Sequence, residues 1–260
     1  MKFVPVTVQQ HGCHSWRRFT NYSFCAAEMV VPIAAAELSR VAGRMPLAFL
    51  STSLGFELVA LLSIIPRRNL FIGADKRWLS KYVPAFFRAY PFAAMRSSPN
   101  SDPILCVDED SNLVTKDESG ECLFDPDGSL SPEVQRIGEF LLEVEKSRAV
   151  ANNAVRALAT AGAIKPFAIN VKVGGQARAI ENLHCVDEEV LNKLPNEAFL
   201  RLRQENAIAV AHAQLMSMEN IETLEDLANA QKSSSIPASS LPDTLDEIFR
   251  AAQNETLKFN

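Results

Sequence analysis

Residues 131–162 read SPEVQRIGEFLLEVEKSRAVANNAVRALATAG, which is the most regular pattern in the chain. Long or apolar side chains recur along it every three or four residues, at Val134, Ile137, Leu141, Val144, Arg148, Ala151, Val155 and Leu158. This spacing places them on one face of a helix, in a heptad stripe. Ser131 and Pro132 predict the start, because a serine oxygen can accept from an unpaired N–H and proline suits the first turn. Gly162 predicts the end, so we expect one helix of about 30 residues.

Arg148 is the one charged residue in this stripe. In one interpretation its aliphatic stem lies along the seam and its guanidinium reaches water. In the other, Arg148 is buried and pairs with a carboxylate, which fixes the register of the helix or holds a ligand. The sequence leaves both interpretations open.

On the N-terminal side of this helix, apolar runs predict a sheet. Residues 46–50, 56–65 and 70–72 are continuous apolar runs bounded by Pro, Gly or Asn, which is typical of strands buried on both faces. Residues 104–107 predict a further strand, and residues 34–41 a short helix.

On the C-terminal side, residues 167–185 alternate between apolar and polar and turn at Gly174-Gly175, which predicts a β-hairpin. Short helices are expected to open at Asp187 and Asn196, and residues 207–231 extend the helical pattern. The fold class is therefore predicted as α+β. We expect a mixed or antiparallel sheet, a long central helix and a C-terminal helical cluster.

The chain divides by composition into three segments. Residues 1–231 are predicted to form a single core, and residues 232–241 a Ser-rich flexible linker. Residues 242–260 form a short amphipathic tail whose apolar face carries Leu245, Ile248 and Phe249. A helix this short is marginal alone, so the tail either folds back on the core or docks into a partner's groove.

Composition excludes several classes of protein. Of 260 residues 47% are hydrophobic and 22% charged, as in globular proteins, and the net charge is -5. An acidic chain without clustered Lys and Arg is not expected to bind nucleic acid. The most apolar run contains Glu57 and stops at Pro66, too short for membrane insertion. Five scattered cysteines without a C-x-x-C indicate a reducing compartment, so we expect a cytoplasmic location.

No familiar catalytic or metal-binding motif occurs in the sequence. The phosphate loop and the nucleophile elbow are both missing. Asp108, Asp110 and Asn112 have calcium-loop spacing, but Leu113 and Ser119 stand where Gly and Glu are required. A solvated turn is the expectation there, with a weak cation site or a structural acid cluster as alternatives.

Histidines give no stronger signal for a site. His11, Cys13 and His14 lie close together and could bind a transition metal, but this spacing lets only some of them point inward at once. The simpler interpretation is a polar N-terminal segment, and we expect no metal and no cofactor. His184 and His212 stand in apolar surroundings and are interpreted as hydrogen-bonded core residues, with a general base as the alternative.

Residues 77–92 concentrate aromatic, arginine and proline residues. In the simpler interpretation they form a rigid aromatic loop packed on the core. In the functional one they form a recognition surface, because Trp, Tyr and Arg dominate binding hot spots. With the nearby acid, the candidate ligand- or partner-binding residues are Arg77, Trp78, Tyr82, Arg88, Tyr90 and Asp108.

This segment also carries a family resemblance. It resembles the SapC-like family of bacterial proteins in Asn69-Leu70-Phe71, Arg77-Trp78, Tyr82-Val83-Pro84-Ala85, Arg88 and Tyr90-Pro91-Phe92. The resemblance continues in Val107-Asp108-Glu109, Phe140, Glu145, Leu194-Pro195, residues 199–203 and Gln214-Leu215-Met216-Ser217, and covers residues 14–230. The family's name derives from surface-layer association and is not that of the peptide-transport permeases. The resemblance implies a tie to cell-surface systems and transfers no catalytic residues.

The function expected from the sequence is a non-catalytic binding or accessory protein with a protein partner, linked to surface-layer or envelope processes. The alternative is an enzyme or a small-molecule-binding protein with its site around residues 77–92. A self-assembling surface-layer subunit is a third reading, and homo-oligomerisation stays open.

Overall fold

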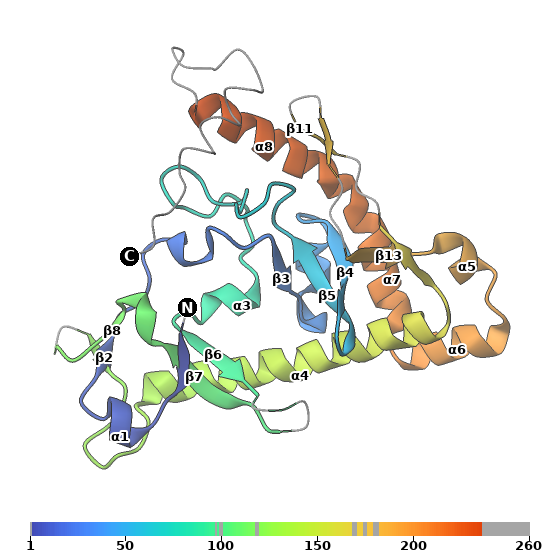
Figure 1. Cartoon of the computed structure of the whole chain (residues 1–260). Coiled ribbons are helices and arrows are strands. Elements are labelled where there is room, and N and C mark those ends of the chain that lie inside the picture. Colours follow the sequence, from blue (N-terminus) through green and yellow to red (C-terminus); the bar gives the residue numbers. More distant parts are fainter. Residues whose placement is uncertain are drawn as a thin grey trace, which may run out of the picture.

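The computed structural model describes residues 2–96, 98, 101–117, 120–167, 171–173, 176–178 and 182–235. The predicted long helix is α4 (Pro132–Thr160), which has 29 residues and crosses nearly the whole molecule (Figure 1). Gly162 follows it with a φ of +72°, in the left-handed region that glycine adopts without strain. The helix and its end are therefore confirmed.

The start of α4 differs from expectation in one detail. The Ser131 side chain accepts no capping hydrogen bond, and its oxygen is buried without a partner among the described residues. Its backbone holds the position instead: the Ser131 N–H donates to the Leu123 carbonyl (3.0 Å), and the Ser131 carbonyl accepts from the Gln135 N–H (2.9 Å).

The larger sheet is antiparallel and five-stranded, which confirms the antiparallel alternative. Its strands in spatial order are β10 (Ile164–Pro166), β13 (Leu183–Val186), β4 (Leu47–Thr52), β5 (Gly55–Leu61) and β3 (Val30–Pro32). The predicted runs at 46–50 and 56–65 fall on β4 and β5, although β5 ends at Leu61, and a hairpin that pairs Thr52 with Gly55 joins them. Most of their apolar side chains are buried, as continuous apolar runs predict.

The third predicted run, residues 70–72, is not a strand. Ile72 makes only an isolated bridge to Trp78, although Leu70 and Phe71 are fully buried. The reason is Asn69, whose side-chain oxygen accepts from the Phe71 N–H (3.0 Å) and bends the backbone into a turn. Burial without ladder pairing gives the same apolar signature as a strand.

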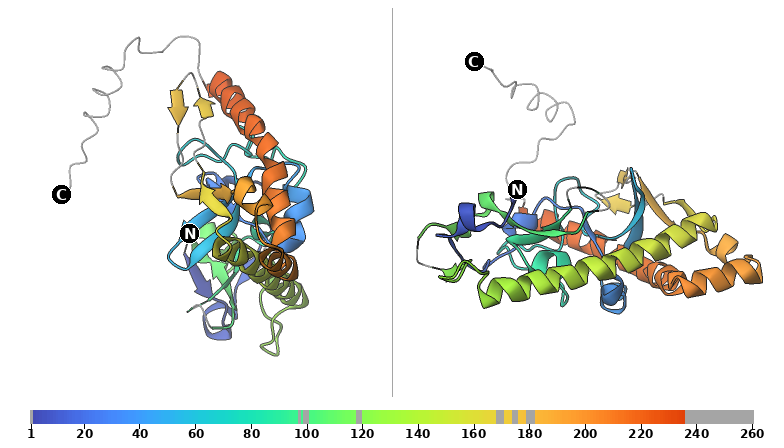
Figure 2. Two further views of the ribbon diagram at one scale, coloured as in Figure 1. Left: turned by 90° about the vertical axis from the view of Figure 1, so that its right-hand side faces the viewer. Right: turned by 90° about the horizontal axis from the view of Figure 1, so that it is seen from below.

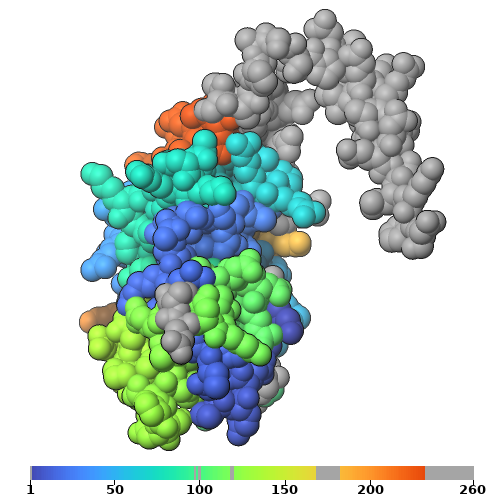
Figure 3. Space-filling model, turned by 90° about the vertical axis from the view of Figure 1, so that its left-hand side faces the viewer, coloured from blue at the N-terminus to red at the C-terminus, as the bar shows by residue number. Residues whose placement is uncertain are grey.

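The smaller sheet carries the N-terminus. Its strands in spatial order are β1 (Phe3–Pro5), β7 (Ile104–Asp108) and β6 (Phe92–Met95), all antiparallel. Beside it lies a set of two-residue strands, β8 (Val114–Thr115), β2 (Ser15–Trp16) and β9 (Glu121–Cys122). The predicted strand at 104–107 is β7. Figure 3 shows the N-terminal residues in dark blue against the green segment that contains β7 to β9.

Short helices fill the connections. They are α1 (Val8–His11), η1 (Ser23–Cys25), η2 (Ala35–Glu37), α2 (Leu38–Val41), α3 (Ala85–Arg88) and η3 (Glu109–Ser111). The predicted helix at 34–41 is the η2–α2 pair. The predicted hairpin is formed by β11 (Val171–Val173) and β12 (Gln176–Arg178), while its turn, Gly174-Gly175, lies outside the described residues.

The C-terminal helical cluster is confirmed. Its members are α5 (Glu188–Asn192), α6 (Asn196–Gln204), α7 (Ala207–Met216), η4 (Ser217–Asn220) and α8 (Ile221–Ser235). The buried Gln214 side chain ties α7 to the larger sheet, because it accepts from the Val186 N–H (3.0 Å) and donates to the Leu47 carbonyl (3.2 Å).

The α8 helix runs to Ser235, so it enters the range predicted as linker. The rest of that range and the tail with Leu245, Ile248 and Phe249 lie outside the described residues. Among the described residues, no helix has both the length and the apolar composition that a bilayer crossing needs.

Two hydrophobic cores share α4. Val134 and Leu141 pack with Trp16, Phe92 and other residues of the smaller core. Ala151, Ala154, Val155 and Leu158, on later turns, pack against the larger sheet and α7. Figure 2 shows α4 running past both parts of the molecule. Its middle turns therefore lie where the two sheets approach each other, and the candidate site is there.

Candidate binding site

The six residues predicted as a binding surface fall into three separate groups. Arg77 is 83% exposed, and its Nε lies 3.5 Å from the Asp75 carboxylate. Trp78 is half-buried: its ring stacks on Phe71, and its indole N–H donates to the Tyr82 carbonyl (2.7 Å). This part of the segment is the rigid aromatic loop of the simpler interpretation.

Tyr82 and Arg88 meet at a buried acid, Glu37, which is 4% exposed. Glu37 Oε1 accepts from the Tyr82 hydroxyl (2.8 Å) and the Ala85 N–H (2.7 Å), and Oε2 accepts from the Ala34 N–H (3.1 Å). Arg88 donates to the Tyr82 oxygen (3.0 Å), with its Nη2 3.7 Å from Glu37. Burial and the bond to Glu37 raise the pKa of Tyr82 to about 12.

This arrangement joins η2 to the start of α3, and every oxygen of Glu37 has a donor. Glu37 was missed by sequence reasoning. The available signal was a single acid inside the apolar run at residues 33–38, since a buried carboxylate needs donors around it.

Tyr90 and Asp108 form the third group. The Tyr90 hydroxyl donates to Asp108 Oδ2 (2.9 Å), and its ring stacks flat on Phe24, with centroids 3.9 Å apart. Asp108 is 1% exposed, and its Oδ1 accepts from the N–H groups of Lys2 (2.7 Å) and Asp110 (3.3 Å). Burial, followed by the bond to Asp108, raises the pKa of Tyr90. Asp108 is thus a buried structural acid, and the expectation of a solvated turn is wrong for this residue.

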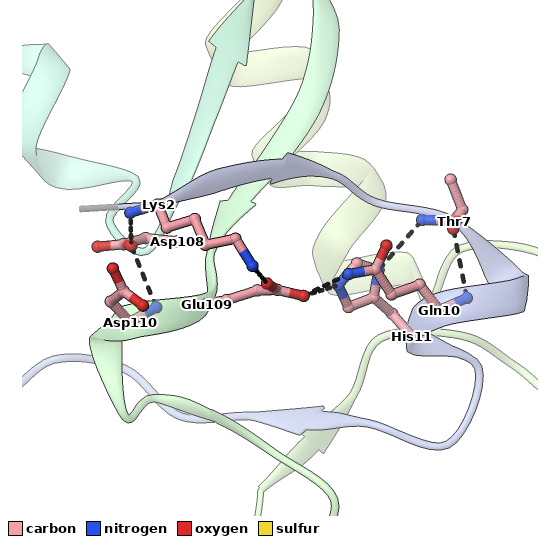
Figure 4. A network of polar contacts seen from close by, with 7 residues as sticks. All are labelled: Lys2, Thr7, Gln10, His11, Asp108, Glu109 and Asp110. Carbon is pink, nitrogen blue, oxygen red and sulfur yellow. Dashed lines mark hydrogen bonds and ion pairs between the residues drawn. The ribbon is translucent and has the colours of Figure 1, made fainter.

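The surrounding network belongs to the N-terminal segment (Figure 4). Glu109 accepts from Lys2 Nζ (2.8 Å) and from the Gln10 amide, and its Oε1 lies 3.7 Å from His11 Nε2. His11 is buried, and its Nδ1 accepts from the Thr7 N–H (3.3 Å). Burial lowers the pKa of His11, with a further contribution from His14. Acids of η3 and polar groups of α1 therefore hold the N-terminus on β7.

The other histidines do not form a site either. His184 packs its ring edge-on against Phe56 (4.7 Å), but it is only partly buried and its Nδ1 has no hydrogen-bond partner among the described residues, so it is not the hydrogen-bonded core residue that was expected. His212 is exposed on α7, so the expectation of apolar surroundings is wrong there, because it occupies the solvent face of a helix whose opposite side is buried. In the described part of the chain, no three His, Cys, Asp or Glu side chains are grouped as a metal site would require.

The strongest candidate site is a cavity of about 330 Å³ between the two sheets. Its wall is mostly apolar and comes from the N-terminal segment, β3, α3, β6 and α4. The lining residues are Phe3, Phe24, Glu28, Val30, Val31, Pro32, Phe86, Phe87, Tyr90, Phe92, Ala93, Ala94, Leu141, Val144 and Glu145. Of the six predicted residues only Tyr90 is among them. We call this space the inter-sheet cavity.

Two carboxylates with different surroundings line the inter-sheet cavity. Glu145 accepts from Arg148 (2.6 Å) and lies 3.7 Å from Arg96 Nε. Arg148 Nε is also 3.1 Å from Glu57 Oε1 on β5, and Arg148 is only 30% exposed. Arg148 therefore pairs with carboxylates, as the second interpretation predicted. Its pair with Glu57 joins α4 to the larger sheet.

Glu28, by contrast, is exposed and makes no ion pair with any residue in the described ranges. Phe86, another residue of the lining, is 45% exposed. Sequence reasoning missed both residues. Neither residue belongs to a recognisable sequence pattern, and only the fold brings both to the wall of one cavity.

Comparisons with known proteins give one result. A search of curated proteins and a search of solved structures each found no match. The profile of one family, SapC, matches residues 6–224, which is most of the chain. The chain therefore belongs to the SapC family, as the motifs between residues 69 and 92 indicated.

Proposed function

We propose that this protein is a non-catalytic binding protein whose site is the inter-sheet cavity, and that it takes up an apolar part of a protein partner. The observation that carries the proposal is the cavity itself: an apolar space of about 330 Å³ whose lining holds an exposed phenylalanine and a carboxylate that forms no ion pair with the described residues. Concave apolar surfaces with a few polar groups are typical of binding sites.

The candidate acid–base groups support binding rather than catalysis. Glu37, Asp108 and their tyrosines are engaged in bonds that hold loops and the N-terminus in place. The charged chain from Glu57 through Arg148 to Glu145 connects α4 to β5. These groups form a rigid frame around the apolar cavity, which favours preorganised binding.

The setting of this function is also a proposal. All five cysteines are free thiols, and Cys13 and Cys122 are exposed, which supports a reducing compartment, the cytoplasm. Membership of the SapC family supports a partner that serves surface-layer or envelope processes.

The test compares two substitutions on the same helix. Val144→Trp places a large ring at the cavity wall, whereas Val150→Trp adds the same ring at an exposed position of α4 outside the lining. Tagged full-length proteins would be expressed in the native cell, and captured proteins quantified by mass spectrometry. We expect a partner retained by the unchanged chain and by Val150→Trp, and lost with Val144→Trp. Equal recovery with both variants, each shown to be folded by thermal melting, would contradict the proposal.

A small-molecule ligand is the alternative, and one observation favours it. Residues Phe86, Phe87 and Tyr90, from the segment that the sequence singled out, line a cavity whose size is in the range of small-ligand pockets. Native mass spectrometry of the protein from its own cell distinguishes the two. A bound small molecule that Val144→Trp removes would favour the alternative.

A further inference from the structure

The inter-sheet cavity is bordered by two strand edges. β3 is the last strand of the larger sheet and β6 the last strand of the smaller one. In Figure 1 both lie above α4, and their sheets extend to opposite sides. Each contributes three consecutive residues to the lining: residues 30–32 of β3 and residues 92–94 of β6. Because side chains alternate along a strand, three consecutive lining residues mean that the backbone edge itself faces the cavity.

The register shows which polar groups of β3 face away from its sheet. The Ile33 N–H donates to the Leu58 carbonyl (3.0 Å), and the Met29 carbonyl accepts from the Leu62 N–H (2.8 Å). Hydrogen-bonded pairs alternate in an antiparallel ladder, so the residues between them turn outward. These are Val30 and Pro32, and Pro32 has no N–H. The free edge of β3 thus offers one donor and two acceptors.

The edge of β6 follows the same logic. The Pro91 carbonyl accepts from the Asp108 N–H (2.9 Å), and the Leu105 carbonyl opposite Ala94 accepts from Val6 on the far side. Phe92 and Ala94 therefore turn their backbone groups away from β7. The Phe92 N–H is already used, donating to Ala89 (2.8 Å), which leaves the Phe92 carbonyl and both groups of Ala94. Strand edges whose backbone groups have no ladder partner are templates for another strand.

The charges around the cavity define the side chains that would suit it. Glu145 is neutralised by Arg148 and Arg96, whereas the Glu28 carboxylate, two residues before β3, has no cationic partner among the described residues. A basic side chain would complement Glu28, and the phenylalanines and valines of the wall would take apolar ones.

We propose that the inter-sheet cavity receives an extended peptide segment of a partner protein, which adds as a strand to the free edges of β3 and β6. Apolar side chains of the segment enter the cavity, and a Lys or Arg lies opposite Glu28. Main-chain bonds supply affinity in this mode of recognition, and alternate side chains supply specificity. This inference rests on the proposed function and names the chemistry of its partner.

The test uses a library of short random peptides selected on the purified full-length protein. Enriched sequences should alternate apolar residues and contain Lys or Arg. Ala94→Pro removes the outward N–H without touching a bond to β7, so the affinity of an enriched peptide should fall about tenfold, as the loss of a backbone hydrogen bond predicts. Ala94→Val keeps that N–H and should bind like the unchanged protein. Glu28→Gln should remove the preference for basic residues.

Other outcomes overturn the inference in distinguishable ways. If peptides bind and Val144→Trp abolishes binding, but Ala94→Pro and Glu28→Gln have no effect, the cavity binds without strand addition and the proposed function stands. If no peptide is enriched although a partner is lost with Val144→Trp, the occupant is not an extended segment. If serine substitutions at Leu245, Ile248 and Phe249 in the full chain strengthen peptide binding, this chain's own tail is the occupant.

Discussion

At the scale of single residues, Glu37 shows how a buried charge can be structural. Its two oxygens accept from two backbone N–H groups and from Tyr82, so the carboxylate replaces the solvent it lost. Glu37 resembles a catalytic acid because it is buried and because its neighbour Tyr82 has a pKa raised by burial and by the bond to Glu37. Its hydrogen bonds, however, leave no room for a substrate.

Glu37→Ala should lower the free energy of unfolding by about 3 kcal/mol, because it leaves the N–H groups of Ala34 and Ala85 buried without acceptors. Tyr82→Phe removes one donor to Glu37 and the acceptor of the part-exposed Arg88, and leaves both backbone bonds of Glu37 in place, so it should cost only about 1 kcal/mol. Urea unfolding followed by circular dichroism measures both. Equal losses for the two variants would mean that the backbone bonds of Glu37 contribute little.

His11 gives a prediction for pH. Its pKa is lowered in the folded state by burial and by His14, against opposing effects of Glu109 and Thr7. The unfolded chain therefore binds a proton more readily, and stability should fall as the pH drops through about 6.5, the ordinary pKa of histidine. Above that pH His11 is neutral in both the folded and the unfolded state, so it no longer changes the stability with pH.

Stability curves between neutral and mildly acidic pH test this, with His11→Asn as the variant. The slope should be reduced in His11→Asn and unchanged in His212→Asn, since His212 is exposed. An unchanged slope in His11→Asn would assign the pH dependence to other titratable groups, such as Glu109, whose Oε1 lies 3.7 Å from His11 Nε2.

At the scale of elements, α4 was predictable and the inter-sheet cavity was not. The helix carries its signals locally: Pro132 at its start, a stripe along its face and Gly162 at its end. The cavity depends on β3 and β6, which have three and four residues and show no recognisable period. Their edges border one cavity only because both sheets pack on one helix, and such long-range placement leaves no trace in neighbouring residues.

The aromatic segment, residues 77–92, also shows how little residue type says about the role of a side chain. Composition indicated a binding surface at residues 77–92. In the structure the Trp78 indole donates to the Tyr82 carbonyl, and the Tyr82 hydroxyl donates to the buried Glu37. Tyr90, eight positions after Tyr82, lines the cavity. Residue type alone could not separate these roles, because an aromatic ring serves a core and a site equally well.

Arg148 provides the prediction at this scale. Arg148→Met leaves the part-buried carboxylates of Glu57 and Glu145 without their shared cation and should destabilise the protein by about 2 kcal/mol. Lys146→Met is the matched comparison on the same helix, because its pair with Glu143 is fully exposed to solvent. It should change stability by less than about 0.5 kcal/mol. Similar values for the two, from chemical denaturation, would show that Arg148 is solvated like Lys146.

At the scale of the whole molecule, two cores depend on one helix. The smaller core surrounds Trp16 and Phe92, and the larger one contains the buried side chains of the five-stranded sheet. The α4 helix contributes side chains to both cores. Melting either half of α4 would expose apolar surface in its core and remove the support of the cavity between them. We therefore expect the described parts of the chain to unfold as one cooperative unit.

The two tryptophans of the chain make this measurable, because each reports on a different core. Trp16 is buried in the smaller core, and Trp78 packs against the larger one. In Trp78→Phe, fluorescence follows Trp16, and in Trp16→Phe it follows Trp78. Within each variant the urea midpoint from fluorescence should coincide with that from far-UV circular dichroism. Leu123→Ala, added to each variant, removes a buried side chain from the smaller core and should lower the free energy of unfolding by about 3 kcal/mol. It should also lower the urea midpoint of the Trp78 fluorescence transition, although Trp78 packs against the other core. If Leu123→Ala lowers the urea midpoint reported by Trp16 and leaves that reported by Trp78 unchanged, the chain contains two folding units, joined by a helix that can melt from one end.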